Sequence, residues 1–334
     1  MHGELSERCD VARVTIQTIA EETGLSKFAV SRALSGKSGV SEATRLKVAE
    51  TADRLGYRKA PASSKLLGVV FDDNDVANTE LHMQIQNGVQ REAQILGYAL
   101  RIRSTRNGIE LKAMAEECSG LLIVGLHSQE NLKRLHHADI PIVRNSWLEP
   151  LEPVDQVGAT DHEAGSAVGR FLLKLGHRRI VYVHGDPRYR GRMERLYGLR
   201  EVCEREPGVV LHDLIPEEGR DFGEAFDRLA ATIEKPTAFF CAHDGLALTV
   251  ISELLARGYR IPRDASVVGF GDYSAAQQIL PQLTTVKVPG VDIGRMATRV
   301  LHQRITNQDF PDCPLRLHVP CRIIERQSTG PAPA

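Results

Sequence analysis

The sequence has no apolar stretch long enough to cross a membrane. Over its 334 residues, no run approaches the roughly 20 consecutive apolar residues that a transmembrane helix needs. The first residues, MHGELSERCDVAR, also lack the basic segment followed by an apolar segment that marks a secretory signal. A membrane protein and an exported protein are therefore disfavoured, and we expect a cytoplasmic location.

Paired cysteines are missing as well. The six cysteines are scattered, without a C-x-x-C pair, at Cys9, Cys118, Cys203, Cys241, Cys313 and Cys321. This distribution suits reduced thiols better than a disulfide framework or a zinc site. We expect no metal and no cofactor.

Local signatures of catalysis are equally scarce. G-x-S-x-G and H-E-x-x-H do not occur. Ser35-Gly-Lys-Ser38 resembles the end of a P-loop, but Ser31 stands where an upstream glycine is required. Gly269-Phe-Gly271 is only a fragment of a dinucleotide-binding turn. The sequence predicts a protein that is not an enzyme, with a catalytic site assembled from distant segments as the alternative.

The length and charge indicate more than one domain. A chain of 334 residues exceeds a single typical core. Its formal net charge is −1, yet residues 13–60 hold nine Lys or Arg against five Asp or Glu. A basic segment in an otherwise neutral chain is typical of a local phosphate-binding patch.

Three short helices are predicted between residues 15 and 57. Thr15, Ser26 and Ser41 are suitable N-caps, and we expect the second helix over 27–34 and the third up to Gly56. One apolar stripe of the third helix consists of Leu46, Ala49, Ala52 and Leu55. A helix, a short turn at Gly24 and a second helix form the unit that places its second helix in the DNA major groove. A generic small helical bundle is the alternative.

From Leu66 onward, apolar runs alternate with amphipathic helical patterns. Strands are predicted at 66–71, 98–102, 120–124, 141–143, 180–183, 209–211, 238–241 and 267–269. Helices are predicted between them at 81–96, 163–175, 193–204, 223–233 and 246–257. Strands without polar alternation, joined by helices, indicate parallel sheets covered on both faces. The layout repeats in two halves, which predicts two doubly wound α/β lobes with a binding cleft between them.

The first segment resembles the headpiece of the LacI/GalR transcriptional regulators. V-T-I-x-x-I-A-x-x-x-G-L-S-x-x-x-V-S-R-A-L-S, V-S-x-x-T-R-x-K-V and L-G-Y-R match that family nearly position by position. The resemblance implies that Lys27, Phe28 and Arg32 read base edges, with Arg32 suited to guanine and Phe28 to a thymine methyl. It implies further DNA contacts, mainly to phosphates, at Thr15, Gln17, Ser26, Ser31, Thr44 and Tyr57. Ser26 has the alternative of being only a helix cap.

The remainder resembles the core of the same family, which is related to periplasmic sugar-binding proteins. The resembling motifs are D-H-E-A-G, L-G-H-R-R-I, R-L-Y-G, A-H-D, V-V-G-F-G-D and P-Q-L-T-T-V. By this resemblance we expect a headpiece at 13–58, a linker at 59–65 and a core at 66–326. Lobe 1 would comprise about 66–171 and 289–316, and lobe 2 about 172–288 and 317–326. The tail from Ser328 is expected to be frayed.

The resemblance also implies an effector site between the lobes. Arg195 would grip ligand oxygens, and His243 replaces the usual asparagine and adds a pH-sensitive group. Trp147, the only Trp, stacks on a ligand or simply packs. Asp272 contacts the ligand or is structural. Residues after the first strand, Asn74, Asp75, Asn78 and Glu80, fall where relatives carry contacts from lobe 1.

The chemistry of the effector is narrowed by two further features. Gly271 replaces an aspartate that holds sugar hydroxyls in relatives, and Arg188, Arg190 and Arg192 precede Arg195. A sugar acid or sugar phosphate is the hypothesis, and a solvated surface loop is the alternative reading of the arginines.

The expected function is a DNA-binding repressor, homodimeric, that binds double-stranded operator DNA and responds to a sugar-like effector. The alternative is a small-molecule binding protein of the periplasmic uptake type. Residues 81–96 and 291–305 are candidates for the dimer contact. The linker 59–65 is too short for the hinge helix of lactose-repressor-like relatives, so we expect it to stay extended and not to insert Leu66 or Leu67 into DNA.

Overall fold

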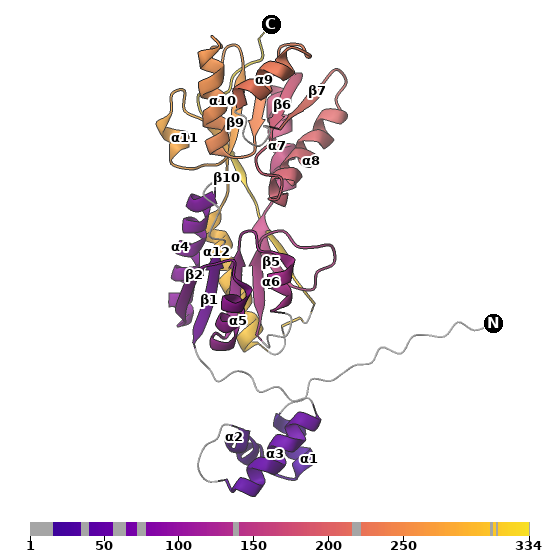
Figure 1. Ribbon diagram of the computed structural model, residues 1–334, viewed down its shortest axis with the longest axis vertical. Coiled ribbons are helices and arrows are strands. Elements are labelled where there is room, and N and C mark those ends of the chain that lie inside the picture. The colour runs from indigo at the N-terminus through magenta and orange to yellow at the C-terminus, as the bar shows by residue number, and fades with distance from the viewer. Residues whose placement is uncertain are drawn as a thin grey trace, which may run out of the picture. The chain divides into compact units, whose positions relative to one another are not determined.

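The computed structural model describes residues 16–34, 40–55, 65–71, 78–135, 140–215, 222–307, 310–311 and 313–333. The chain divides into two compact units, Met1–Ser64 and Lys65–Ala334. Both units appear in Figure 1. None of the helices in the described ranges combines the length and the apolar character that spanning a membrane requires.

Unit 1 contains the three expected helices, α1 (Ile16–Thr23), α2 (Lys27–Leu34) and α3 (Glu42–Arg54). Gly24 follows α1 in the left-handed region, at φ 68°, which a residue without a Cβ adopts without strain. The Ser26 hydroxyl accepts the Ala29 amide at 3.2 Å, and that of Ser41 accepts the Thr44 amide at 3.2 Å. Both serines therefore cap the helices that follow them.

The small core of unit 1 is made by Ile19, Ala20, Val30, Val48 and Ala52. The predicted stripe on the third helix was wrong in part. Leu46 is 59% exposed and Ala49 is also exposed, because α3 turns Val48, Thr51 and Ala52 toward the other two helices.

Unit 2 is built on two sheets of six strands. The first has the order β11-β5-β4-β3-β1-β2, and its recorded strand pairs are all parallel. Its strands are β1 (Leu66–Phe71), β2 (Ala99–Ser104), β3 (Gly120–Val124), β4 (Ile142–Asn145), β5 (Asp155–Ala159) and β11 (Arg316–Val319). It is flanked by α4 (Thr79–Leu96), α5 (Gly108–Glu117), α6 (Gln129–Lys133) and α12 (Gly290–Thr306). Figure 1 shows α12, from late in the chain, beside α4.

The second sheet has the order β12-β10-β9-β8-β6-β7. Its strands are β6 (Arg179–Val183), β7 (Val210–Leu214), β8 (Ala238–Cys241), β9 (Ser266–Gly271), β10 (Thr284–Lys287) and β12 (Arg322–Ile324). β12 pairs with β10 in the antiparallel sense. The helices are α7 (Asp161–Lys174), α8 (Arg190–Glu204), α9 (Phe222–Ala230), α10 (Asp244–Ala256) and α11 (Ala275–Gln278). Two parallel-sheet lobes and a small helical unit confirm the predicted fold class.

The chain crosses between lobes at other places than expected. We expected the first crossing near residue 171, but α7 packs closely against α8 and belongs to lobe 2, so the crossing lies at Thr160. The last crossing was expected at 316, yet β11 still pairs with β5 in lobe 1. Only the strand after Cys321 joins β10 in lobe 2.

The tail is docked on lobe 2, contrary to the expectation of a frayed end. Ser328 is fully buried; its hydroxyl accepts the Thr284 amide at 2.8 Å and donates to the Val267 carbonyl at 2.6 Å. The buried ring of His177 lies 3.1 Å from the Gly330 carbonyl. Backbone and side-chain groups of the tail therefore form hydrogen bonds with lobe 2, which the apolar composition of GPAPA did not indicate.

Candidate effector cleft and DNA-binding unit

Three of the residues predicted to bind the effector, Arg195, His243 and Asp272, follow β6, β8 and β9 in the chain. Arg195 on α8 is held by three segments of lobe 2. Its Nε donates to Asp161 Oδ1 at 2.8 Å, and its Nη1 donates to the carbonyl oxygen of Ala242. Its Cζ lies 3.4 Å from the centroid of the Phe270 ring. The guanidinium is therefore fixed in orientation, with 13% of the side chain exposed.

His243 is the N-cap of α10, where its Nδ1 accepts the Leu246 amide at 3.2 Å. Burial, together with the positive charges of Arg192 and Arg195, lowers its pKa to about 4. The imidazole is therefore neutral near pH 7. The predicted pH-sensitive group is present, but its titration lies in the acidic range.

The carboxylate of Asp272 is occupied by two basic side chains of its own lobe. Its carboxylate contacts Arg326 Nη2 at 2.5 Å and Lys287 Nζ at 3.3 Å, and its side chain is 5% exposed. These contacts support the structural alternative.

Asp244, directly after His243, was not predicted as a site residue although its motif was noted. It is fully buried, and its two carboxylate oxygens accept Thr285 Oγ1 at 2.5 Å and the Tyr273 amide at 2.7 Å. Burial raises its pKa to about 6.

Trp147 follows β4 and is 38% exposed. The buried Arg144 fixes its loop by donating to the Trp147 carbonyl at 2.9 Å and pairing with Glu152 at 2.6 Å. The Arg190 guanidinium of lobe 2 lies 5.9 Å from the Trp147 ring and 5.1 Å from the Tyr197 ring. The structure thus brings Trp147 of lobe 1 and the arginine-rich segment of lobe 2 together.

The arginines before Arg195 differ in their surroundings. Arg188 pairs with Asp186 at 2.6 Å, and Arg190 pairs with Glu194 at 2.9 Å, so carboxylates of their own segment balance both charges. Arg192 is only 4% exposed and lies with its Cζ 4.4 Å from the centroid of the Tyr189 ring. The solvated-loop reading holds for Arg188 but not for Arg192.

Lobe 1 contacts lobe 2 through the start of α4. Asn74 and Asp75 lie outside the described residues. Asn78 and Glu80 contact lobe 2 directly, at Tyr273 and Ser274. The sequence predicted that Asn78 and Glu80 lie near the effector site, but it gave no sign of their partners Tyr273 and Ser274.

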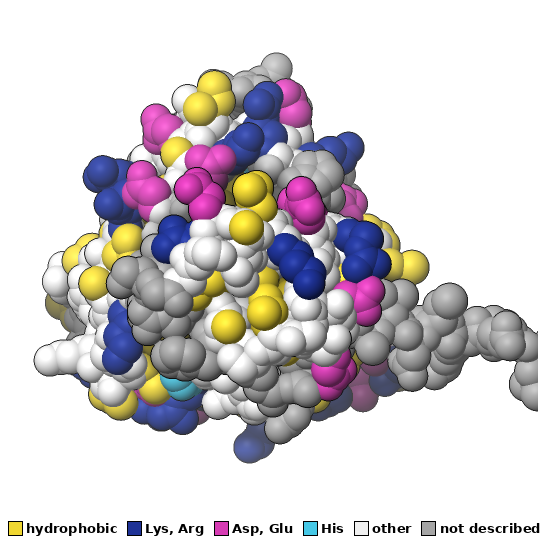
Figure 2. Space-filling view, turned by 90° about the horizontal axis from the view of Figure 1, so that it is seen from below, with side chains coloured by type: hydrophobic (Ala, Val, Ile, Leu, Met, Phe, Trp, Pro, Cys, Tyr) yellow, Lys and Arg dark blue, Asp and Glu magenta, His cyan; other side chains and the backbone are white. Residues whose placement is uncertain are grey.

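The predicted DNA-contacting residues are only partly described. Thr15 and Tyr57 lie outside the described residues. Gln17 lies on α1, and Lys27, Phe28, Ser31 and Arg32 lie on α2, with side chains outside those described. Ser26 caps α2 and is exposed, and the Thr44 hydroxyl is 2.8 Å from that of Ser41. In Figure 2, Lys and Arg lie among Asp, Glu and small apolar patches, without a continuous basic surface among the described side chains of that face.

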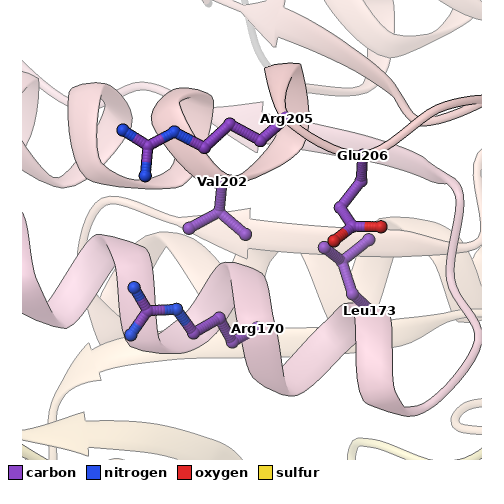
Figure 3. A pocket seen from close by; sticks show the side chains of 5 residues that line it. All are labelled: Arg170, Leu173, Val202, Arg205 and Glu206. Atoms are coloured by element: carbon purple, nitrogen blue, oxygen red, sulfur yellow. The ribbon is translucent and has the colours of Figure 1, made fainter.

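A separate hollow of about 240 Å³ lies where α7 and α8 end, away from Asp161 at the start of α7. It is lined by Arg170, Leu173, Val202, Arg205 and Glu206, and Figure 3 shows Val202 between the side chains of Arg205 and Arg170, which come from the two neighbouring helices. Within the described residues, no cluster of three or more His, Cys, Asp or Glu could hold a metal ion.

Comparison with known proteins identifies both parts of the chain. Residues 15–59 match the bacterial regulatory proteins of the lacI family, and residues 170–329 match a periplasmic binding protein-like domain. This chain belongs to the LacI family of transcriptional regulators. It is 29% identical to catabolite control protein A of Priestia megaterium, over 95% of this chain and 99% of that protein. It is 27% identical to the repressor PurR of Vibrio atlanticus (strain LGP32), over 94% of this chain and 98% of the relative.

Solved structures agree with this family assignment. A complex of the transcriptional regulator CelR with cellobiose has a TM-score of 0.68 and 27% identity, covering 95% of this chain and 100% of that one. The lac repressor dimer bound to operator has a TM-score of 0.66 at 23% identity, covering 95% of this LacI-family chain and 99% of that chain, and shows the shared fold.

Proposed function

We propose that this protein is a sequence-specific DNA-binding transcriptional repressor whose affinity for its operator is set by a small-molecule effector bound between the two lobes. The observation that carries the proposal is one chain with two parts. A capped helix–turn–helix in unit 1 matches the lacI family over residues 15–59. A two-lobed unit follows, with an oriented guanidinium, Arg195, at the carboxyl ends of its strands.

The proposed DNA contacts are those expected from the sequence. Lys27, Phe28 and Arg32 would meet base edges from α2. Contacts that position the protein without reading sequence would come mainly to phosphates, from Thr15, Gln17, Ser26, Ser31, Thr44 and Tyr57. For Ser26, capping and phosphate contact are compatible, since the cap uses only one lone pair of the hydroxyl.

The proposed effector is a sugar or sugar derivative. CelR, which shares 27% of its sequence with this chain, is named as a cellobiose complex. Arg195, His243 and Trp147 would contact the effector, with Asn74 contributing from lobe 1, and Asp272 would hold the site in shape. The buried Arg192 beside Arg195 and neutral His243 favours an effector with an acidic group.

The remaining proposals concern organisation. We place the headpiece at 13–58, the linker at 59–65 and the core at 66–326, extended by the docked tail. The protein would act in the cytoplasm as a homodimer, without catalysis, since its relatives are named as regulators. A two-fold dimer implies an operator with pseudo-palindromic half-sites.

Selection of duplexes from a random-sequence library by the purified full chain tests the DNA-binding function, because the operator sequence need not be specified in advance. We expect enrichment of a pseudo-palindrome whose half-sites are about one helical turn apart, with binding that weakens steeply as salt rises. Ligand binding without any enriched sequence would favour the uptake-type binding protein instead.

A thermal-shift panel of neutral sugars, sugar acids and sugar phosphates tests the effector class. We expect stabilisation by acidic members of the panel and its loss in Arg195→Ala. Arg200→Ala on the same helix is the control, because Arg200 pairs with Asp213 of the edge strand β7 at 2.7 Å and is not among the proposed effector contacts. Stabilisation by neutral sugars alone would contradict the acidic-effector proposal.

A further inference from the structure

The two lobes contact each other directly through a turn of lobe 2 and the start of α4 in lobe 1. Ser274 donates its backbone amide to both carboxylate oxygens of Glu80, at 2.9 and 3.1 Å. Its hydroxyl donates to Glu80 Oε2 at 3.0 Å. The Tyr273 hydroxyl lies 3.4 Å from Asn78 Oδ1. Hydrogen bonds to a carboxylate are among the strong ones in proteins, and here one carboxylate accepts from two donors of the opposite lobe.

The turn that presents Ser274 is fixed within lobe 2. Gly271 and Asp272 both have positive φ, at 132° and 57°. Glycine adopts such a conformation without strain, whereas it is uncommon for a residue with a side chain such as Asp272. A Cβ on Gly271 would lie 2.7 Å from the Tyr273 ring, so the ring occupies the space that a side chain would need.

Buried charges hold the same turn in place. Asp244 accepts the Tyr273 amide at 2.7 Å, and Arg326 pairs with Asp272 at 2.5 Å. The turn is therefore a rigid projection of lobe 2, and its contact with Glu80 reports the position of lobe 2 as a whole.

The helix that receives this contact runs through lobe 1 to the beginning of unit 2. α4 has 18 residues and is therefore about 27 Å long. Ala99, just beyond its end, donates to the carbonyl of Lys65 at 2.6 Å, and Lys65 is the first residue of unit 2. In its C-terminal third, α4 is tied to α12 by the buried Glu92, which pairs with Arg295 at 3.1 Å and Arg299 at 2.7 Å.

From this geometry we infer that Glu80 and Ser274 form a clasp that sets how far the effector cleft closes, and that α4 carries this setting to the base of the linker. Glu80 and Ser274 act as positioning residues and need not touch the effector. The biological meaning of the clasp rests on the proposed function, whereas its existence does not.

Hydrogen–deuterium exchange on the full chain tests the clasp without DNA or effector. In Glu80→Ala we expect the backbone amides of 273–279 to exchange on the order of 10- to 100-fold faster. This factor corresponds to the free energy that is lost when hydrogen bonds to a charged group are removed. If the clasp sets closure, peptides on the other side of the cleft, 144–150 and 186–197, exchange faster too. Ser274→Ala keeps the amide donor and should give a smaller increase at the same peptides. The double variant should equal Glu80→Ala alone, because both changes break one contact.

Glu110→Ala is the matched control, since Glu110 is exposed and lies in the first turn of α5 as Glu80 lies in that of α4. It should leave all these peptides unchanged. An increase confined to 273–279 would overturn the closure role, as would no increase at all. Should Glu80→Ala fail to fold, the Ser274→Ala result decides by the same criterion. Failure of the clasp leaves the library selection for DNA unaffected, and failure of that selection leaves the exchange result standing.

Discussion

Gly165 on α7 and Arg195 on α8 meet where the two helices cross, and a Cβ on residue 165 would overlap the carbonyl oxygen of Arg195. A matching approach occurs between Gly198 and the carbonyl of His162. The absence of side chains at both glycines lets the helix backbones touch. This contact brings the Arg195 side chain within 2.8 Å of Asp161 on the neighbouring helix. The guanidinium of the cleft is therefore placed by a backbone contact.

Gly165→Ala should consequently disturb the cleft as well as the fold. The added methyl must push α8 away, and overpacking of this kind costs about 1–3 kcal/mol or more in the free energy of unfolding. Denaturant unfolding measures the loss, and the effector thermal shift should fall with it. Gly158→Ala is the control, because a Cβ there meets no atom within 4 Å. Equal stability of the two variants would contradict the packing argument.

The strands that the sequence located best are those with continuous apolar runs. Residues 66–71, 120–124 and 238–241 were predicted with the bounds that the structure has, because buried parallel strands need apolar side chains on both faces. β5, with the sequence DQVGA, has no such run and was missed. The crossing at Thr160 was misplaced because an amphipathic helix such as α7 shows that it packs on something, but not on which lobe.

The positions of single residues in lobe 2 were predictable where a motif marks them, and the pairing of residues was not. Arg195 and His243 lie where the motifs indicated, at the carboxyl ends of lobe 2. The contacts of Asp244 with Thr285 and of Glu80 with Ser274 join residues 41 and 194 positions apart. Only the folded chain brings such partners together, so no local pattern reveals them.

His243→Asn should change the pH dependence of stability. The folded-state pKa of His243 is about 4 against an ordinary 6.5, so the unfolded chain binds more protons between these values. Its contribution to stability is present above pH 6.5 and is lost as the pH falls toward 4. Asn can still cap α10 but does not titrate. Relative to the parent chain, the variant should therefore gain about 2 kcal/mol at pH 5 compared with pH 7.5.

Asp244 makes this differential measurement necessary. Its folded-state pKa of about 6 exceeds the ordinary 3.8, so the folded chain binds more protons in that window. Its effect on stability opposes that of His243 over nearly the same range of pH. In the parent chain the two residues together would therefore change the free energy of unfolding little with pH. Urea unfolding of both proteins at the two pH values gives the difference. If the free energies of unfolding of the two proteins differ by the same amount at both pH values, the pKa of His243 is not lowered in the folded chain.

Ser328→Ala should show that the docked tail contributes to stability. The substitution removes the acceptor of the Thr284 amide and a donor to the Val267 carbonyl at a fully buried position. Buried groups left without partners cost about 1–3 kcal/mol, measurable as a lower midpoint of urea unfolding. Ser252→Ala, at an exposed position of α10, should have little effect. A neutral Ser328→Ala would mean that the tail detaches without cost.

Arg32→Ala should remove selectivity for the operator rather than general affinity for DNA. One bidentate contact with guanine contributes about 1–3 kcal/mol of discrimination. Titration of the selected sequence and of a scrambled duplex, at the same salt, should show the loss on the selected sequence alone. Thr15→Ala is the comparison, and a phosphate contact there should weaken both duplexes about equally. Equal losses for both duplexes in Arg32→Ala would remove this residue from the base-reading set.

The operator should not be kinked by a leucine inserted from the linker. Leu66 and Leu67 were the only candidates for such a wedge, and both lie in β1, where they pair with Ala99 and Leu100. Leu67 is 1% exposed, and Leu66 accepts the Ser119 amide at 2.8 Å. Moving either residue into the minor groove would break the pairing of β1 with its neighbours β2 and β3. A fluorescence DNA-bending assay should therefore give the same bend angle for the parent chain and for Leu66→Ala, which removes the half-buried side chain and leaves the core residue Leu67 in place. A sharp central bend that disappears in Leu66→Ala would show that the strand opens on DNA and that the linker works as an intercalating hinge.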